Sequence, residues 1–156
     1  MESRSTTTEG GLDRPRWVRL TRFLDAPPYR VFRAWSHPEE LARWFPQRVE
    51  GSLAPGTRTI LAWPAQRVWW DVVTVDADRT FSFRWPWTPN DNWVTTVTVR
   101  LAPHGTGTRI TLEDGPFDIR IPGVLDAWGE CQEGWGEALA LLRAHLDFSA
   151  DLRTFR

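Results

Sequence analysis

Two aspartates stand where carboxylates could carry out acid–base chemistry. Asp71 and Asp114 lie in segments whose alternating apolar residues predict β-strands, in the phase that we expect to face the interior. A carboxylate among aromatic side chains loses hydration, which raises its pKa and suits it to donate or accept a proton. The competing interpretation, which we favour, is that an arginine such as Arg67 or Arg84 pairs with one or both aspartates, or that they lie at a strand end in water.

The histidines and the cysteine do not form a second reactive set. His37 precedes a proline, His104 stands in an expected hairpin turn and His145 lies late in an expected helix, so we do not expect them to meet in a metal site or a catalytic triad. The single cysteine, Cys131, excludes an intramolecular disulfide, and we interpret it as a small buried hydrophobe. A position near a helix N-terminus would instead lower its pKa. The sequence predicts no metal and no cofactor.

Tryptophan is the unusual component of this chain, with 11 in 156 residues. Each aromatic side chain buries roughly 150–250 Å², so a domain of this size cannot easily place all of them in a conventional core. Any single tryptophan on an inner strand face belongs more often to a core than to a cavity wall. Several of them on one concave surface favour a cavity.

Strand phase and helix periodicity together predict which residues line that cavity. Aromatic walls with a few convergent polar groups are typical of small-molecule sites, and flat indole rings suit a planar, polycyclic guest. The predicted ligand-binding residues are Trp63, Trp69, Phe83, Trp85, Trp93, Thr95, Leu112, Cys131, Gln132 and Trp135.

For the remaining tryptophans the pattern allows alternative places. Trp17, Trp70 and Trp87 are candidates for the outside, where an apolar patch would favour a homodimer. Trp44 and Phe45 would either belong to the mouth of the cavity or cover the edge of the sheet.

The hydrophobic period predicts the elements that position these residues. Period-2 alternation indicates strands at 17–24, 47–53, 57–63, 67–76, 80–85, 92–101 and 108–114, with Trp69, Asp71, Val73 and Val75 on the inner face of the segment 67–76. Helical spacing and proline positions indicate short helices at 28–36 and 38–45. A long helix is expected from about Asp126 to Asp147, with one apolar stripe formed by Trp128, Trp135, Leu139, Leu142 and Leu146.

Composition and charge predict one cytoplasmic domain. The net charge of −1 argues against nucleic acid as the main partner, because phosphate binding needs an excess of basic side chains on one face. No apolar run approaches the ~18 residues of a membrane span, and the polar residues 1–15 do not resemble a signal peptide. We expect a disordered tail at 1–15, a domain at 16–148 and a short tail at 149–156.

The local text resembles a known family. The segment 24–45 reads LDAPPYRVFRAWSHPEELARWF and is similar to the signature of the Aha1-like branch, the Hsp90-ATPase-activator homologues, of the SRPBCC (START/Bet v 1-like) superfamily. Further matches are VTVDADRTFSFRW and VTVRL…GTRITLEDGPF. The resemblance covers about residues 17–147 and implies an α+β helix-grip fold. In this fold a curved antiparallel sheet of about six to seven strands wraps around a long C-terminal helix, with two short helices after the first strand.

The same resemblance implies a deep cavity and several functions. Members bind apolar or aromatic small molecules, and some are polyketide cyclases, carriers or antibiotic self-resistance proteins. Enediyne self-resistance members are thought to be cleaved at a glycine, but no motif transfers that role to Gly115. In eukaryotic Hsp90 activators this module follows a separate N-terminal domain that has no counterpart here, so a chaperone accessory is the weaker alternative.

We therefore expect a protein that binds a hydrophobic, aromatic or polycyclic small molecule without changing it. The alternatives are a cyclase, aromatase or dehydratase that uses Asp71 or Asp114, and a self-resistance protein that sequesters a natural product.

Overall fold

The structure is a computed structural model that describes residues 14–87 and 93–155. Most of the tail predicted at 1–15 lies outside the described residues, as does part of the connection before the strand predicted at 92–101. The elements in chain order are β1 (Arg16–Leu24), α2 (Pro28–Ser36), α3 (Pro38–Leu41), β2 (Arg48–Glu50), β3 (Arg58–Trp63), β4 (Gln66–Asp76), β5 (Thr80–Pro86), β6 (Val94–His104), β7 (Gly107–Phe117) and α4 (Val124–Phe148).

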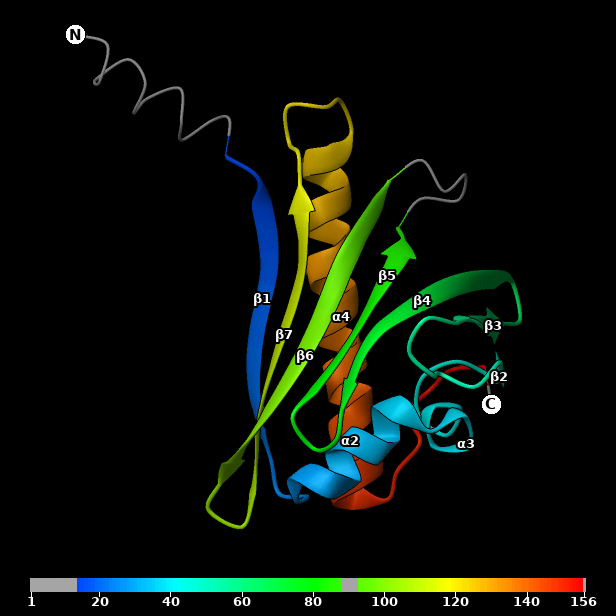
Figure 1. Ribbon diagram of the computed structural model, residues 1–156, viewed down its shortest axis with the longest axis vertical. Helices are drawn as coiled ribbons and strands as arrows, with labels where there is room; N and C mark the ends of the chain where they lie inside the picture. Colours follow the sequence, from blue (N-terminus) through cyan, green and yellow to red (C-terminus); the bar gives the residue numbers. More distant parts are fainter. Residues whose placement is uncertain (1–13, 88–92, 156) are drawn as a thin grey trace, which may run out of the picture.

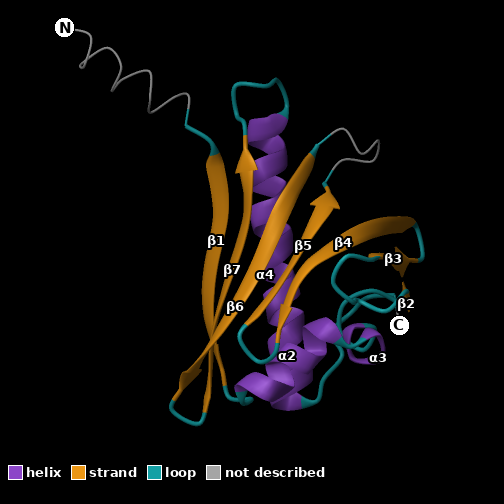
Figure 2. Ribbon diagram, viewed as in Figure 1, coloured by secondary structure: helices purple, strands orange, loops and turns teal. Residues whose placement is uncertain are grey.

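The described strands form one antiparallel sheet of seven strands in the order β1-β7-β6-β5-β4-β3-β2. From β2 to β7 each strand pairs with the next along the chain, whereas β1 pairs with β7. Figures 1 and 2 show the curved sheet with the long helix α4 behind it and the short helices α2 and α3 at one end. This is the α+β helix-grip fold that the sequence predicts.

Helix α4 packs its apolar stripe against the sheet. Its buried side chains include Trp135, Leu139, Leu142 and Leu146, as the spacing predicts. The helix begins at Val124, slightly before the predicted start, because Gly123 takes the left-handed φ of 87° that turns the chain into the helix. Among the described residues, no helix is both long and apolar enough to cross a membrane.

The C-terminal end of α4 also holds the corner between β1 and α2. Helix α2 begins at Pro28, where the missing N–H would have had no helical partner. The carboxylate of Asp147 accepts hydrogen bonds from the backbone N–H of Asp25 (3.0 Å) and of Ala26 (3.1 Å). The chain reversal after β1 is therefore tied to the last turn of the molecule's longest helix.

The predicted face of β4 is wrong in its first part. Trp70 points inward and is only 1% exposed. Trp69 lies on the outer face, with the guanidinium carbon of Arg58 at 4.1 Å from its ring centroid. Because two tryptophans stand side by side in the sequence, alternation makes either phase equally hydrophobic and cannot choose between them.

A bulge then changes the phase of the same strand. The register between β4 and β5 shifts between Val72 and Thr74, so Val73 becomes the extra residue and is exposed rather than inward. Val75 returns to the predicted phase, opposite the buried Phe81, but its side chain is exposed near the end of the strand. Strand phase could be predicted only where no bulge and no tryptophan pair intervenes.

Candidate functional site

An aromatic cavity of about 250 Å³ lies between the inner face of the sheet and helix α4. Trp63 from β3, Trp70 from β4 and Trp85 from β5 form the sheet wall, and Trp135 closes it from the helix. The residues that line this tryptophan cavity are Phe45, Trp63, Gln66, Val68, Trp70, Trp85, Trp87, Ala127, Glu130, Cys131, Gly134 and Trp135.

Asp114 of β7 is the polar centre next to this cavity and is fully buried. Its Oδ2 accepts hydrogen bonds from the indole N–H of Trp85 at 3.1 Å and of Trp135 at 3.0 Å. Its Oδ1 accepts one from the hydroxyl of Thr95 at 2.5 Å. Hydrogen bonds to an ionised acceptor are the stronger kind. Asp114 thereby sets the orientation of one tryptophan from the sheet and one from the helix, whose ring centroids are 5.3 Å apart.

Burial shifts the proton equilibrium of this carboxyl group. Loss of hydration raises the pKa of Asp114 from 3.8 to about 6, and the hydrogen bonds from Thr95, Trp135 and Trp85 act in the opposite direction. Of the two interpretations of Asp114, the structure therefore supports a carboxylate that has lost hydration among aromatic side chains, and not one that is paired with an arginine.

Asp71 is the arginine-paired carboxylate. It lies on the outer face, where Arg58 donates hydrogen bonds from Nε at 2.7 Å and from Nη2 at 3.0 Å. These bonds hold the pKa of Asp71 below its usual value. The placement of Asp71 and Trp69 on the inner face is therefore wrong, because the true inward residue of this segment is Trp70.

The other predicted ligand-binding residues lie in different places. Trp63, Trp85, Cys131 and Trp135 line the tryptophan cavity. Phe83 and Leu112 have no exposed surface and belong to the core, Thr95 bonds Asp114, and the half-buried Trp93 stacks on Trp87 at 6.1 Å. Gln132 is exposed, so its predicted inward position is wrong.

Sequence reasoning also missed part of the lining. Trp70 and Trp87 were candidates for the outside, yet both border the cavity. Phe45, for which the mouth of the cavity was one of two predicted places, also belongs to the lining. On α4 the cavity face is marked by the small residues Ala127, Cys131 and Gly134. Their spacing places them on one helix face. Of these three, only Cys131 was predicted, because small residues carry little weight in a hydrophobic pattern.

Cys131 and Gly115, two residues for which a chemical role was considered, both have structural explanations. Burial raises the pKa of the Cys131 thiol to about 12, with smaller contributions from Asp114 and Glu130, so it stays protonated at neutral pH. Gly115 lies under the indole of Trp17, and a Cβ at this position would come within 2.6 Å of the ring. Close packing against β1 therefore accounts for this glycine.

The histidines do not meet. His145 lies 3.4 Å from a carboxylate oxygen of Glu40, His37 contacts the hydroxyl of Ser36, and His104 packs against Phe23. Within residues 14–87 and 93–155, no cluster of histidine, cysteine, aspartate and glutamate has the geometry of a metal site.

Several solved structures share this architecture. Protein MLL2253 from Mesorhizobium loti is 25% identical over 86% of this chain and 99% of its own, with a TM-score of 0.75. DynU16, described as a protein in the dynemicin biosynthetic locus, has a TM-score of 0.75 at 22% identity. The match covers 88% of this chain but 49% of DynU16, so this chain spans about half its length.

A third similar structure is the Aha1 dimer from Colwellia psychrerythraea, at 14% identity over 84% of this chain and 96% of its own, with a TM-score of 0.73. A comparison with curated proteins finds no match. The family model for the activator of Hsp90 ATPase homolog 1-like protein matches residues 25–147. The chain therefore belongs to the Aha1-like family of the SRPBCC superfamily.

Proposed function

We propose that this protein binds a hydrophobic, planar aromatic or polycyclic small molecule in the tryptophan cavity. The observation that carries the proposal is a cavity walled by indole rings, in which Trp85 and Trp135 are held by the buried Asp114. A wall that is fixed before the ligand arrives loses little side-chain entropy on binding. Stacking and edge-to-face contacts on such a wall favour flat aromatic guests.

Tryptophan fluorescence tests this proposal. Titration with a panel of polycyclic aromatics should quench or shift the emission with saturation, because Trp85 and Trp135 line the cavity in which the ligand would lie. Natural products belong in the panel, since one similar structure is described as a protein of a biosynthetic locus. A sequestering protein would bind such a compound and release it unchanged.

Two substitutions on opposite faces of the sheet provide the matched comparison. Trp85→Ala removes part of the cavity wall and should weaken binding by about tenfold or more, which corresponds to about 1.4 kcal/mol. Trp69→Ala removes an indole from the outer face beside Arg58 and should leave the affinity unchanged. Equal affinity of both variants and the original protein, or no spectral response to any compound, would refute the proposal.

Acid–base catalysis by Asp114 is the second candidate. A pKa of about 6 gives this group both protonation states near neutral pH. Against catalysis, both carboxylate oxygens already accept hydrogen bonds from Thr95, Trp85 and Trp135. Turnover of a bound compound that is lost in Asp114→Asn, while binding persists, would establish the enzyme. Recovery of every bound compound unchanged would exclude it for that panel.

Self-association is a separate proposal. The tryptophans on which it rested do not form an exposed patch, since Trp70 is buried and Trp17 and Trp87 are half-buried. The support that is left is the similar structure from Colwellia psychrerythraea, which is described as a dimer. Sedimentation velocity at several concentrations decides: a single monomeric species throughout would refute a homodimer.

A further inference from the structure

A second cavity among the described residues, of about 440 Å³, adjoins the tryptophan cavity. Phe45, Trp63 and Gly134 line both of them. The rings of Phe45 and Trp63 meet edge to face, with centroids 5.2 Å apart. The two spaces therefore share a border made of two aromatic rings on one side and a bare stretch of helix on the other.

Gly134 is the reason that the helix is bare at this border. Glycine in a helix interior is less favourable than alanine, because its backbone loses more conformational freedom on folding. Packing does not require it here, because a Cβ built on Gly134 would meet no heavy atom within 4 Å. Gly134 borders both cavities, so a larger side chain at this position would project into the space where they adjoin.

The far wall of the second cavity is the C-terminal segment, residues 149–155. Helix α4 contributes Ala138 and Leu141, and the segment contributes Leu152 and Phe155. The lining surface is mainly apolar, although Glu137, Arg153 and Thr154 also border the cavity. Figure 1 shows the segment running back from the end of α4 toward β2 and α3. A stretch that the sequence marks only as a tail thus forms a wall beside the site.

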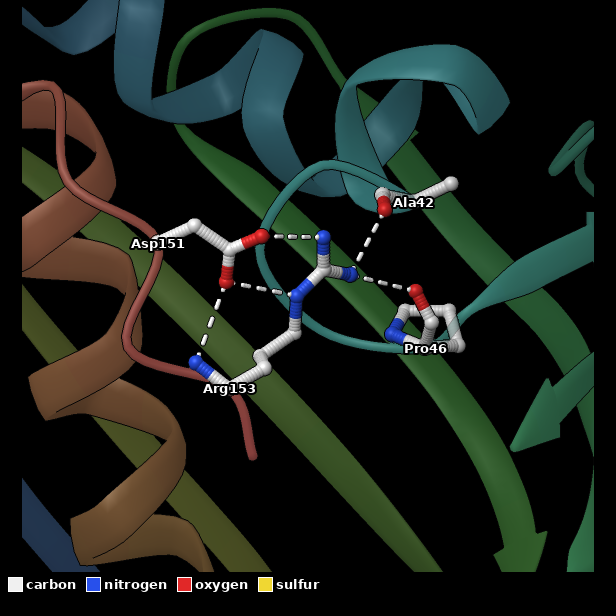
Figure 3. A network of polar contacts seen from close by, with 4 residues as sticks. All are labelled: Ala42, Pro46, Asp151 and Arg153. Atoms are coloured by element: carbon white, nitrogen blue, oxygen red, sulfur yellow. Dashed lines mark hydrogen bonds and ion pairs between the residues drawn. The ribbon is translucent and has the colours of Figure 1, made fainter. Parts of the chain in front are cut away.

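Arg153 fixes this wall in place. Its guanidinium donates to both carboxylate oxygens of Asp151, at 2.9 and 2.8 Å, and to the backbone carbonyl oxygens of Ala42 and Pro46, each at 2.7 Å (Figure 3). The side chain is only 11% exposed. Pro46 follows Phe45 directly, so one arginine joins the C-terminal segment to the loop that carries a ring of the shared border.

A similar local motif at the other end of α4 provides a comparison. Arg120 pairs with Asp118, two residues before it, through the same Nε and Nη2 atoms, at 2.9 and 3.0 Å. Its side chain is 61% exposed, whereas that of Arg153 is nearly buried against the loop of Ala42 and Pro46. The burial of Arg153 is therefore a property of its place and not of the Asp-x-Arg sequence.

We infer that the second cavity is an extension of the ligand site and takes an apolar acyl or alkyl chain attached to the aromatic part of the ligand. The inference rests on the proposed function, because the aromatic part lies in the tryptophan cavity. In this arrangement the chain passes Gly134, which borders both cavities, and lies beside the segment held by Arg153. The ligand class is thus an aromatic compound with an apolar chain, rather than a bare polycycle.

A pair of fluorescent probes tests this inference. Both contain the same dimethylaminonaphthalene, one with a propanoyl group and the other with an octanoyl group. The readout is the ratio of their dissociation constants, measured from probe emission. Because each buried methylene strengthens binding, the octanoyl probe should bind the original protein at least about tenfold more tightly.

Matched variants then locate the source of that preference. Gly134→Leu, Arg153→Ala and removal of residues 149–156 should each reduce the ratio to about one to three, because the space beside Gly134 or the wall is lost. Gly129→Leu and Arg120→Ala should keep the original ratio, since Gly129 also has open space around its Cβ position but borders neither cavity. Near-ultraviolet circular dichroism checks that each variant folds. If the shortened chain does not fold, the ratios of Gly134→Leu and Arg153→Ala alone test the inference.

Each outcome separates the two proposals. A ratio of about one in the original protein, or a ratio that Gly134→Leu and Arg153→Ala leave unchanged, overturns the inference while binding of the aromatic part stands. Failure of both probes and of the polycyclic panel to bind overturns the proposed function, and the inference with it.

Discussion

Asp114 shows how one residue can organise a cavity without lining it. Its carboxylate holds Trp85, Trp135 and Thr95 at hydrogen-bond distance while it is itself fully buried. Truncating a buried acceptor leaves its donors unsatisfied, at about 1–3 kcal/mol each. The residue is therefore a positioning group, and its ionisation should be visible in the stability of the fold.

Stability should depend on pH through Asp114 with a definite sign. The folded pKa of about 6 lies above the ordinary value of 3.8, so the folded state binds the proton more tightly. The contribution is fully present below about pH 4 and is lost as the pH rises through 6, by up to about 3 kcal/mol. Asp114→Asn should thus cost more stability at pH 4 than at pH 7, measured by urea unfolding.

Asp71→Asn is the control for this prediction, because its sign is opposite. Hydrogen bonds from Arg58 lower the pKa of Asp71, so its contribution is present above the ordinary pKa and is lost as the pH falls. The effect should be small, since the pair lies in solvent on the outer face. A cost of Asp114→Asn that is equal at both pH values would contradict the burial of this charge.

The reactivity of Cys131 should show that its thiol is buried beside the tryptophan cavity. With a pKa of about 12, its thiol is almost entirely protonated at pH 8. Alkylation by iodoacetamide should therefore be slower than in urea-unfolded protein by about two orders of magnitude or more. Mass spectrometry of the time course measures both rates, and equal rates would show that the thiol is not buried.

At the scale of elements, sequence reasoning succeeded where one signal dominates. Alternation placed Phe83 in β5, Thr95 in β6 and Asp114 in β7 on the inner face, as found. It failed for Trp69 and Trp70, where two equal side chains compete and a bulge follows. On α4 sequence reasoning found Cys131 and Trp135 but not Ala127 and Gly134, because small residues carry little weight in a hydrophobic pattern. The C-terminal wall could not be predicted, since its contacts join residues far apart in the sequence.

Substitution of a glycine by alanine should change the stability of the fold in opposite directions, depending on whether the glycine packs closely against its neighbours. A Cβ at Gly129 would meet nothing within 4 Å, so Gly129→Ala should stabilise helix α4 by about 0.5–1 kcal/mol. A Cβ at Gly107 would collide with the backbone carbonyl oxygen of Leu24 in the paired strand β1. Gly107→Ala should therefore destabilise the protein, by about 1–3 kcal/mol. Thermal unfolding of both variants checks the pair, and the same sign for both would contradict it.

At the scale of the whole molecule, the two ends of the domain are joined. Asp147 in the last turn of α4 accepts the backbone N–H groups of Asp25 and Ala26, just after β1. The hydroxyl of Thr108 in β7 donates to the carbonyl oxygen of Ala26 at 2.8 Å. The sheet, the long helix and the corner before α2 are therefore expected to unfold as one unit.

Asp147→Ala tests this connection. Two backbone donors lose a charged acceptor, which should lower the free energy of unfolding by about 2 kcal/mol. Glu133→Ala, at an exposed position of the same helix, should change it by less than about 0.5 kcal/mol. Urea unfolding gives both values, and equal effects of the two substitutions would show that the contact to the corner contributes nothing.

The pairing of β1 with β7 also sets the order of events during synthesis. Val18 lies opposite Asp114, so β1 has no partner until nearly the whole sheet has been translated. At ~5–20 residues per second this strand waits on the order of 5–20 s. The other described strands pair with their neighbours along the chain, whereas a distant pairing such as β1 with β7 forms late because a long stretch of chain must first be brought together. We therefore expect the sheet to close only after β7 has left the ribosome, with Trp17 settling over Gly115 among the last contacts.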